Sequence, residues 1–294
     1  MGHILIKTTI PPGGEDWHTD RFSLLKSHLE SLTGPDGALL RVSARDREVN
    51  DASDDPDLIG LADSDVDQLW LFALDVADAL TERDAKGIHA FRRRGGGLFM
   101  ARDHQDMGRS LLKLGRIGQL NCFQSANPEP DETRRCIDDT GTPTISWPNY
   151  NSGRNGDYQE VQVLAPDHPL VRGPSGEPLR YLPAHPHEGA VVAPSSFGDV
   201  VQVVLGGRSA VTGRPFNIAV AADGDTDDDG TPLGRALAQS TFHHFADYNW
   251  DIERGAPSFV TEPPGRALLD HPEAMAHTRA YVANIVGWLG GAAG

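Results

Sequence analysis

The stretch DQLWLFAL, Asp67–Leu74, restricts the fold more than any other part of the sequence. Its last six residues, 69–74, are all apolar, with no alternation between apolar and polar positions. A strand with one face in water alternates, whereas a strand covered on both faces reads as a continuous apolar run. The stretch therefore predicts a central strand of a parallel sheet, with helices on both sides of it.

Strand-like and helix-like segments alternate around this run. Predicted strands lie at His3–Thr9, 38–44 and Gly97–Ala101. Predicted helices lie at Arg21–Leu32, Thr81–Gly95 and Asp106–Gly118, where leucines and other apolar residues recur at helical spacing. This order predicts an α/β fold, in which a mostly parallel central sheet has right-handed crossovers and helices on both faces.

The second half of the chain departs from this rhythm. Residues 121–158 are rich in Asn, Pro, Asp and Gly, and they predict an irregular insertion of the kind that is often functional or mobile. Four short strand candidates follow, at Glu160–Ala165, Asp199–Gly207, Phe216–Ala222 and Arg235–Phe242. A final helix is expected to begin after Asp270 as N-cap, with Glu273 three residues later, and to end at Gly290. Because neither an internal repeat nor a linker is evident, we expect one domain over residues 1–294.

Composition excludes several classes of function. The net charge of −16 argues against nucleic acid, whose phosphates need a basic surface. No apolar run approaches the ~18–20 residues of a membrane span, and the N-terminus lacks an export signal, so a cytoplasmic location is expected. Cys122 and Cys136 form no CxxC pattern and suggest no disulfide framework. A small-molecule substrate is the expected partner, and a homo-oligomer is compatible with the sequence.

Polar side chains follow the predicted strand Gly97–Ala101. Arg102, Asp103 and His104 stand where a wound parallel sheet exposes side chains to ligands, beyond the carboxyl end of a strand. A carboxylate next to a histidine suits proton transfer. The alternative is a polar turn in which Asp103 only caps the next helix.

Two adjacent histidines, His243 and His244, end the predicted strand Arg235–Phe242. On extended backbone their side chains point to opposite faces, so that one faces a cleft while the other packs inside. A mix of polar and aromatic groups that suits a small-molecule site follows at once: Asp247, Tyr248, Asn249 and Trp250.

The segment PAHPHEG, Pro183–Gly189, offers a possible metal site. His185 and His187 lie two residues apart and share one side of an extended segment, with Glu188 adjacent. Imidazole pairs bind zinc and other transition metals, and a third ligand would come from elsewhere, such as His104 or His243. The alternative is a proline-stiffened loop whose histidines bind water.

Other motifs are incomplete. Asp225–Gly230 has the D-x-D-x-D-G opening of a calcium loop, but position twelve is Ala236 instead of a bidentate glutamate, which favours a solvated hairpin connection. No nucleophile elbow and no phosphate-binding loop occur in the sequence. Both cysteines are interpreted as ordinary thiols.

Four of these stretches together resemble the class I glutamine amidotransferase-like superfamily and, within it, the trehalose-utilisation (ThuA-like) proteins and their bacterial relatives. They are FRRRGGGLFMARDH (91–104), PDHPLVRG (Pro166–Gly173), GRALAQSTFHHF (234–245) and DQLWLFAL. The resemblance implies a flavodoxin-like three-layer sandwich, with a mostly parallel central sheet and added short strands in the C-terminal half.

The resemblance also bears on activity. In amidotransferases of this superfamily, the strand that Gly97–Ala101 resembles leads to a cysteine nucleophile, and the histidine that His243 matches activates it. Here Arg102 and Asp103 stand near the cysteine's place, and neither side chain forms the thioester that glutamine hydrolysis requires. The comparison therefore implies that this chain is not a cysteine glutamine amidotransferase.

Three functional hypotheses follow. The first is an enzyme, a hydrolase or a lyase or isomerase, that acts on a small polar metabolite such as a sugar derivative by acid–base chemistry. The second is a non-catalytic binding or scaffold protein, or a subunit that docks through residues 121–158. The third is a metal-dependent hydrolase that holds a divalent ion such as zinc at His185 and His187. For the first, the catalytic candidates are His243, His244, Asp103 and His104, and the substrate-binding candidates are Arg102, Glu188, Asp247, Tyr248 and Trp250.

Overall fold

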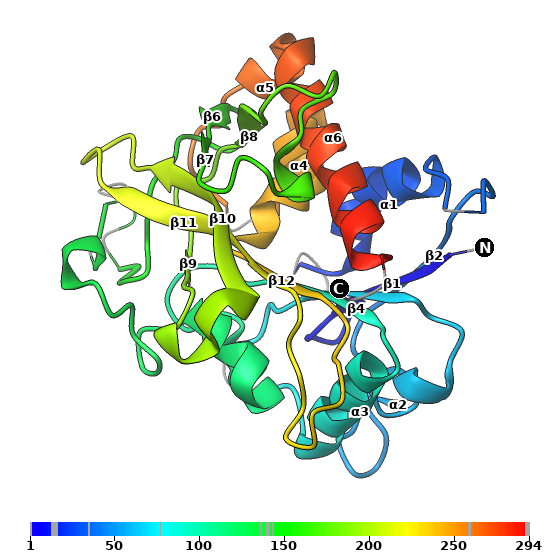
Figure 1. The fold of residues 1–294 in the computed structure, drawn as a ribbon. Coiled ribbons are helices and arrows are strands. Elements are labelled where there is room, and N and C mark those ends of the chain that lie inside the picture. Colours follow the sequence, from blue (N-terminus) through cyan, green and yellow to red (C-terminus); the bar gives the residue numbers. More distant parts are fainter. Residues whose placement is uncertain are drawn as a thin grey trace.

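An eight-stranded sheet forms the centre of the protein, in a computed structural model that describes residues 2–12, 17–34, 36–76, 78–135, 137–138, 142, 144–257 and 260–291 (Figure 1). The strand order is β2-β1-β3-β4-β12-β11-β10-β7. The first five strands pair in parallel, and β11, β10 and β7 continue the sheet in antiparallel pairs. The strands are β1 (His3–Thr8), β2 (Arg41–Arg45), β3 (Gln68–Phe72), β4 (Gly97–Ala101), β7 (Gln162–Val163), β10 (Val201–Arg208), β11 (Pro215–Ala222) and β12 (Ala236–Gln239).

The central strands are buried on both faces. Every residue of β1, β3 and β4 is buried. Within β3, Trp70 and Phe72 belong to one hydrophobic core, while Leu69 and Leu71 belong to a second core on the opposite face. The α/β fold with a mostly parallel central sheet, predicted from the unbroken apolar run, is confirmed.

Helices form the two outer layers (Figure 1). On one face lie α1 (Ser23–Glu30), α4 (Asp247–Trp250), α5 (Ala267–Asp270) and α6 (Pro272–Leu289). On the other lie α2 (Pro56–Ile59) and α3 (Glu82–Arg93). Thr81 caps α3 through a capping box with Asp84. None of the helices in the described ranges is long and apolar enough to cross a membrane.

Smaller elements occupy the segments between the sheet strands. Two pairs of short antiparallel strands join distant segments: β5 (Asn121–Cys122) with β9 (Ala190–Val191), and β6 (Tyr158–Glu160) with β8 (Tyr181–Pro183). The short 3-10 helices are η1 (Thr19–Phe22), η2 (Leu61–Asp63), η3 (Arg109–Leu120), η4 (Glu132–Arg134), η5 (Pro169–Val171), η6 (Ser195–Val200), η7 (Phe242–Phe245) and η8 (Ile252–Arg254). Within 121–158, the described residues are mostly irregular, as predicted.

Two helix predictions need correction. The segment predicted as a helix at Asp106–Gly118 instead contains the 3-10 run η3, which begins at Arg109 and is interrupted at Gly115, where φ is 65° and ψ is −132°. Asp270 is not the N-cap of the last helix but the last residue of α5. Helix α6 has His271 at its N-cap and Pro272 at its first position. Proline is favoured there because the backbone N–H that it lacks would have no partner within the helix.

The prediction that His243 and His244 end an extended strand is also wrong. Strand β12 ends at Gln239, and both histidines lie on η7, which the Thr241 side chain caps by accepting the His243 N–H. Their side chains still diverge, because successive residues of a 3-10 helix are about a third of a turn apart.

The Asp225–Gly230 segment lies in the connection between β11 and β12, as the hairpin interpretation predicted. Its aspartates pair with cations instead of converging on one another. Asp225 is buried against Arg92 and Arg116, and Arg93 on α3 binds Asp227 and Asp229. The ion pairs of these aspartates with Arg92 and Arg93 therefore anchor the connection to α3.

The parallel register of β4 and β12 determines where the site lies. Ala101 pairs with Gln239 at the last position of both strands. The residues that follow each strand, Arg102–His104 and Ser240–His244, therefore leave the same edge of the sheet side by side.

Candidate functional site

A cavity of about 180 Å³ lies at this edge of the sheet. Segments far apart in the sequence form its walls, and most of its polar groups are imidazoles and carboxylates. The lining residues are Trp17, Asp103, His104, Met107, Thr142, Ile145, Asn155, His185, His187, His243, Tyr248, Val260, Thr261 and Glu262.

Asp103 is the centre of this cluster and is only 1 % exposed. Its Oδ2 lies 3.3 Å from Nε2 of His243 and 3.6 Å from Nε2 of His104. Its Oδ1 accepts a 2.7 Å hydrogen bond from the Thr241 hydroxyl. Burial raises the pKa of Asp103, but the imidazoles of His243 and His104 outweigh this effect and bring the pKa below its ordinary value. The cluster is therefore built around a carboxylate.

His243 connects this carboxylate to Tyr248. Because Nε2 faces Asp103, it carries the proton, and Nδ1 is left to accept from the Tyr248 hydroxyl at 3.2 Å. Burial, with the nearby Asp103 charge, raises the pKa of Tyr248 well above its ordinary value, so the phenol stays protonated. The result is a directed chain of hydrogen bonds from Tyr248 through His243 to Asp103.

The hydrogen-bond network also assigns the tautomer of His185. Asn249 donates to Oδ1 of Asn155 at 3.2 Å, which identifies that atom as an acceptor. Nδ1 of His185, 2.8 Å from the same oxygen, must therefore carry a proton. Burial, followed by the charges of neighbouring histidines, lowers the pKa of His185 well below its usual range. The neutral ring keeps a lone pair on Nε2, a buried atom that lies 3.6 Å from Oδ1 of Asp103 and has no hydrogen-bond partner in the described part of the chain.

The cavity contains side chains that can bind a metal ion, but the histidine rings are not oriented for coordination. Asp103, His185 and His243 offer donor atoms that all lie within 4.8 Å of one another. The rings of His185 and His243, however, are stacked, with centroids 3.5 Å apart and planes 13° from parallel. An imidazole binds a metal in its ring plane at about 2.0–2.1 Å, and two stacked rings cannot both do so. One ring must rotate before an ion fits.

The remaining two histidines of the cavity, His104 and His187, lie beside each other, with ring centroids 5.7 Å apart. Burial lowers the pKa of His104, and its Nδ1 is buried with no hydrogen-bond partner among the residues described. Both nitrogens of His187 have partners. Nδ1 lies 3.3 Å from Oδ1 of Asn149, and Nε2 lies 2.9 Å from Oε1 of Glu262. Burial raises the pKa of Glu262, but hydrogen bonds from His187, Thr142 and the backbone, together with the nearby imidazole, outweigh this effect and lower the pKa overall. His187 is not part of the possible metal-donor group, although the sequence suggested it.

Two residues predicted to bind substrate have other contacts. The Arg102 guanidinium, fully buried, donates to the carbonyl of Gln105 at 2.6 Å and lies 4.3 Å from the ring centre of Phe123. Burial lowers the pKa of Arg102 to about 10. The Asp247 carboxylate accepts the N–H of Leu24 at 2.8 Å and the hydroxyl of Ser23, so it caps α1 from a distance. Neither residue lines the cavity.

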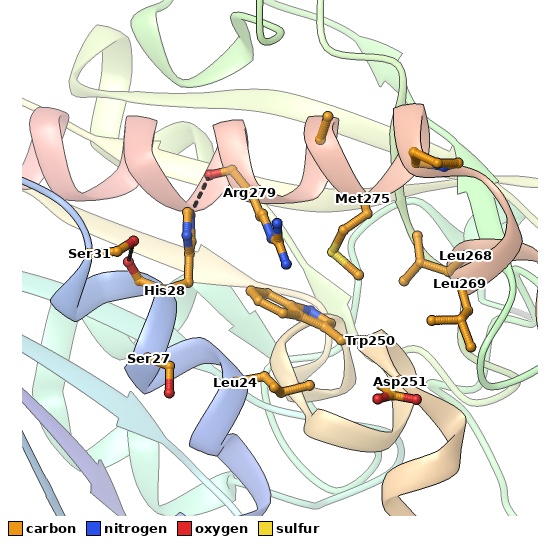
Figure 2. A pocket seen from close by; sticks show the side chains of 12 residues that line it. Leu24, Ser27, His28, Ser31, Trp250, Asp251, Leu268, Leu269, Met275 and Arg279 are labelled. Carbon is orange, nitrogen blue, oxygen red and sulfur yellow. Dashed lines mark hydrogen bonds between the residues drawn. The ribbon is translucent and has the colours of Figure 1, made fainter.

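Trp250 faces a second, larger cavity of about 590 Å³ between α1, α4, α5 and α6 (Figure 2). Its indole lies on the floor with Leu24, Leu268 and Met275 nearby, and Arg279 extends towards it (Figure 2). Among the described residues that line it, the one imidazole is that of His28, which is bound to the carbonyl of Arg279 and whose pKa is lowered by burial. This cavity lacks the cluster of acid–base groups that the smaller one has, so we assign the site to the smaller cavity.

Glu188 and His244 lie behind the small cavity and do not line it. Both side chains are fully buried, and Nε2 of His244 is 3.3 Å from Oε1 of Glu188. The two adjacent histidines of the sequence thus belong to two different acid–imidazole pairs.

Of the two cysteines in the sequence, the structure describes Cys122 alone. Cys122 is buried, and its burial raises the pKa of the thiol to about 12, so it is unreactive at neutral pH. Cys136 lies outside the described residues.

Several residues that contact the candidate site were missed from the sequence. Trp17 packs edge-on against His243 at 4.7 Å between ring centres, and Asn155 orients His185. Thr241 holds Asp103, and Glu262 holds His187. Asn155 lies in the irregular segment 121–158, whose unusual composition was the only signal available. Trp17, Thr241 and Glu262 had no signal in the sequence, because single polar or aromatic residues in loops are common.

Neither a family model nor a curated protein matches this chain. Among solved structures, it is similar to the glutaminase domain of Trypanosoma brucei CTPS with bound acivicin, at 12% identity and TM-score 0.46, covering 97% of this chain and 94% of that one. It is similar to the N-terminal domain of mmIFT52, at 14% identity and TM-score 0.45, covering 85% and 94%. It is also similar to a ThuA-like protein from Parabacteroides merdae, at 13% identity and TM-score 0.44, covering 98% and 89%.

The lowered histidine pKa values predict acid sensitivity. Burial lowers the pKa of five described histidines, His28, His104, His168, His185 and His277. Below about pH 6.5 the unfolded chain binds protons that the native state does not, so the free energy of unfolding falls as the pH falls. Each group contributes at most about 1.4 kcal/mol per pH unit until its folded pKa is reached. The lowered pKa of Asp103 reduces the free energy of unfolding only below about pH 4, outside the pH range in which the histidines act.

Urea unfolding at pH 7.5, 6.5 and 5.5 measures this effect. We expect His185→Asn, whose amide can still donate to Asn155, to show a smaller loss of stability between pH 6.5 and 5.5 than the unmodified protein. An equal fall in the free energy of unfolding in both proteins would show that His185 does not contribute to the acid sensitivity.

Proposed function

We propose that this protein is an enzyme that acts on a small, uncharged, polar metabolite by acid–base chemistry in the 180 Å³ cavity. The observation that carries the proposal is the arrangement of two complementary groups around one space. The Tyr248–His243–Asp103 chain presents a neutral hydroxyl donor, and His185 presents an unpaired lone pair.

The roles follow from the protonation states. Nε2 of His185 takes a proton from the substrate as general base. The Tyr248 hydroxyl turns its one proton from Nδ1 of His243 to the substrate oxygen on which negative charge develops, while Asp103 keeps the His243 proton on Nε2. Such a pair of groups suits isomerisation or elimination next to a carbonyl, the lyase or isomerase class.

The residues that line the cavity support one class of substrate over others. Among the described residues, neither lysine nor arginine lines the cavity, whereas Asp103 and Glu262 do. A phosphate or carboxylate would meet no cationic partner and would approach two carboxylates. Hydroxyl groups find donors and acceptors in four imidazoles and Asn155, and Trp17 supplies an apolar wall. A sugar, a keto-sugar or another polyol of about monosaccharide size therefore fits best.

Two measurements on the purified protein test this function. Thermal shift at pH 7.5 is read with neutral sugars, keto-sugars and polyols, each compared with its phosphorylated or acid analogue. Compounds that bind are then incubated with the protein in D₂O, and NMR follows deuterium at carbons next to the carbonyl. We expect stabilisation by neutral compounds only, together with protein-dependent exchange.

The possible results separate the alternatives. Binding without any exchange or turnover would favour a non-catalytic binding protein. Preference for the anionic analogues would contradict the proposed substrate class, and a lack of binding by every compound would favour a scaffold.

A second candidate is metal-assisted hydrolysis, favoured by the compact donor set of Asp103, His185 and His243. It requires the His185 ring to leave its stack on His243. Elemental analysis of protein purified without chelator, repeated after dialysis against zinc, distinguishes the two. The acid–base proposal expects less than one metal per chain in both samples.

A further inference from the structure

A second acid–imidazole pair lies directly behind the cavity and has no role in the chemistry proposed above. Glu188 and His244 are both 0 % exposed, and neither lines the cavity. A buried carboxylate needs compensating donors, so the groups that surround this pair indicate what it does.

Four donors from three chain segments converge on the Glu188 carboxylate. Oε1 accepts from the Ser152 hydroxyl at 2.5 Å and the Gln159 amide at 2.5 Å, and lies 3.3 Å from Nε2 of His244. Oε2 accepts from the Ser240 hydroxyl at 2.8 Å. A neutral amide in this position could not accept from all four.

A directed chain of side chains fixes the His244 ring. The Tyr281 hydroxyl donates to Oε1 of Gln239 at 2.8 Å, which turns the amide nitrogen towards Nδ1 of His244 at 2.7 Å. Nδ1 therefore accepts, and Nε2 carries the proton that faces Glu188. The pair is thus oriented from α6, which contains Tyr281.

The donors of Glu188 are also contacts of the cavity residues. Ser152, which donates to Glu188, accepts the backbone N–H of His185 at 2.9 Å. Ser240, the other hydroxyl donor, directly precedes Thr241, whose side chain holds Asp103 and caps the turn that begins before His243. The N–H of Gly189 binds the carbonyl of Ser240 at 3.1 Å. Glu188 therefore joins the segment that carries His185 to the segment that carries His243.

We propose that Glu188, with His244, is a positioning residue that holds the two segments so that the His185 and His243 rings stack beside Asp103. This inference rests on the proposed function for its catalytic consequence, but its geometric content stands apart from it. Buried charged groups with their polar partners contribute little net stability and can contribute geometric specificity. Here the geometry concerned is the 3.5 Å stack between the proposed base and the histidine that holds the proposed acid.

Glu188→Gln tests the proposal, because it keeps the shape and removes the charge. One of its two polar atoms becomes a donor and faces the hydroxyl or amide donors of the site. We expect a crystal structure of this variant to show the two imidazole rings separated or turned out of their stack. On a substrate from the deuterium-exchange screen, we expect kcat to fall about 10- to 100-fold, with KM changed less than about twofold. Glu48→Gln, the same change at an exposed position, is the matched control and should change neither.

The outcomes separate positioning from stability and from the proposed function. If Glu188→Gln lowers the melting temperature but leaves the ring stack and kcat unchanged, Glu188 is a structural residue and the proposal is overturned. If the unmodified protein has no acid–base activity, the proposed function fails, while the ring geometry in the variant still tests positioning. Should Glu188→Gln not fold, Ser240→Ala, which removes one donor only, replaces it with the same two readouts.

Discussion

Asp103→Asn is expected to lower kcat on the neutral substrate about 10²- to 10⁴-fold, the range over which positioned acid–base groups act. The carboxylate lies 3.3 Å from Nε2 of His243 and keeps the proton on that nitrogen. An asparagine can turn its amide group towards the same atom, so that His243 places its proton on Nδ1 instead. His243 then donates to the Tyr248 oxygen instead of accepting from its hydroxyl, so the hydrogen bond that orients the Tyr248 proton is lost.

Steady-state kinetics and histidine NMR check this prediction together. Long-range ¹H–¹⁵N spectra of ¹⁵N-histidine protein, assigned with His243→Gln, should show His243 changing from the Nε2–H to the Nδ1–H tautomer in Asp103→Asn. The matched control is Asp247→Asn, the same substitution at a carboxylate that caps α1. It should reduce stability and leave kcat within about threefold, as expected for a lost cap outside the cavity. Retention of more than half of kcat by Asp103→Asn would remove Asp103 from the mechanism.

Lys7→Met is expected to lower the free energy of unfolding by about 3–5 kcal/mol. The Lys7 ammonium is completely buried on β1 and lies 2.8 Å from Oδ2 of Asp55 and 2.8 Å from Oδ2 of Asp57. Asp55 is itself fully buried, and methionine would leave its charge without a partner in the interior. Removing one member of a buried pair costs far more than the pair contributes, because the remaining ion keeps its desolvation penalty.

Urea unfolding at pH 7.5 measures this loss, and Arg45→Met provides a matched control. Arg45 pairs with the same Asp57, but its side chain is 61% exposed, so we expect a change below about 1 kcal/mol. The double variant Lys7→Met/Asp55→Asn should recover part of the stability lost in Lys7→Met. Equal losses in the free energy of unfolding for Lys7→Met and Arg45→Met would show that burial does not determine how much the Lys7 ion pairs contribute to stability.

The layered fold could be predicted because its signals are local. The unbroken apolar run of β3 requires cover on both faces, and helical spacing on either side supplies the covering elements. The ends of β4 and β12 could be predicted to carry functional residues, because parallel strands place their carboxyl ends at one edge. Asp103 and His243 were identified on this basis, and the structure places them 3.3 Å apart.

The partners of each site residue could not be predicted, because they come from loops far away in sequence. Nothing in the stretch FHHF indicates that His243 faces the cavity while His244 pairs with Glu188 behind it. That division depends on a 3-10 turn capped by Thr241, which replaces the extended backbone expected from the sequence. Arg102 and Asp247 have the chemistry of ligand-binding residues, and only their contacts show that they hold a turn and cap α1.

The sequence alone determined the sheet, its covering helices, the absence of a cysteine after β4, and the edge at which polar groups gather. These features follow from apolar periodicity and residue type over short distances. Only the tertiary structure decided which imidazole keeps a free lone pair and which carboxylate lies at the cavity. Protonation and orientation of a buried polar group depend on every donor and acceptor packed against it, and those groups come from at least three distant segments.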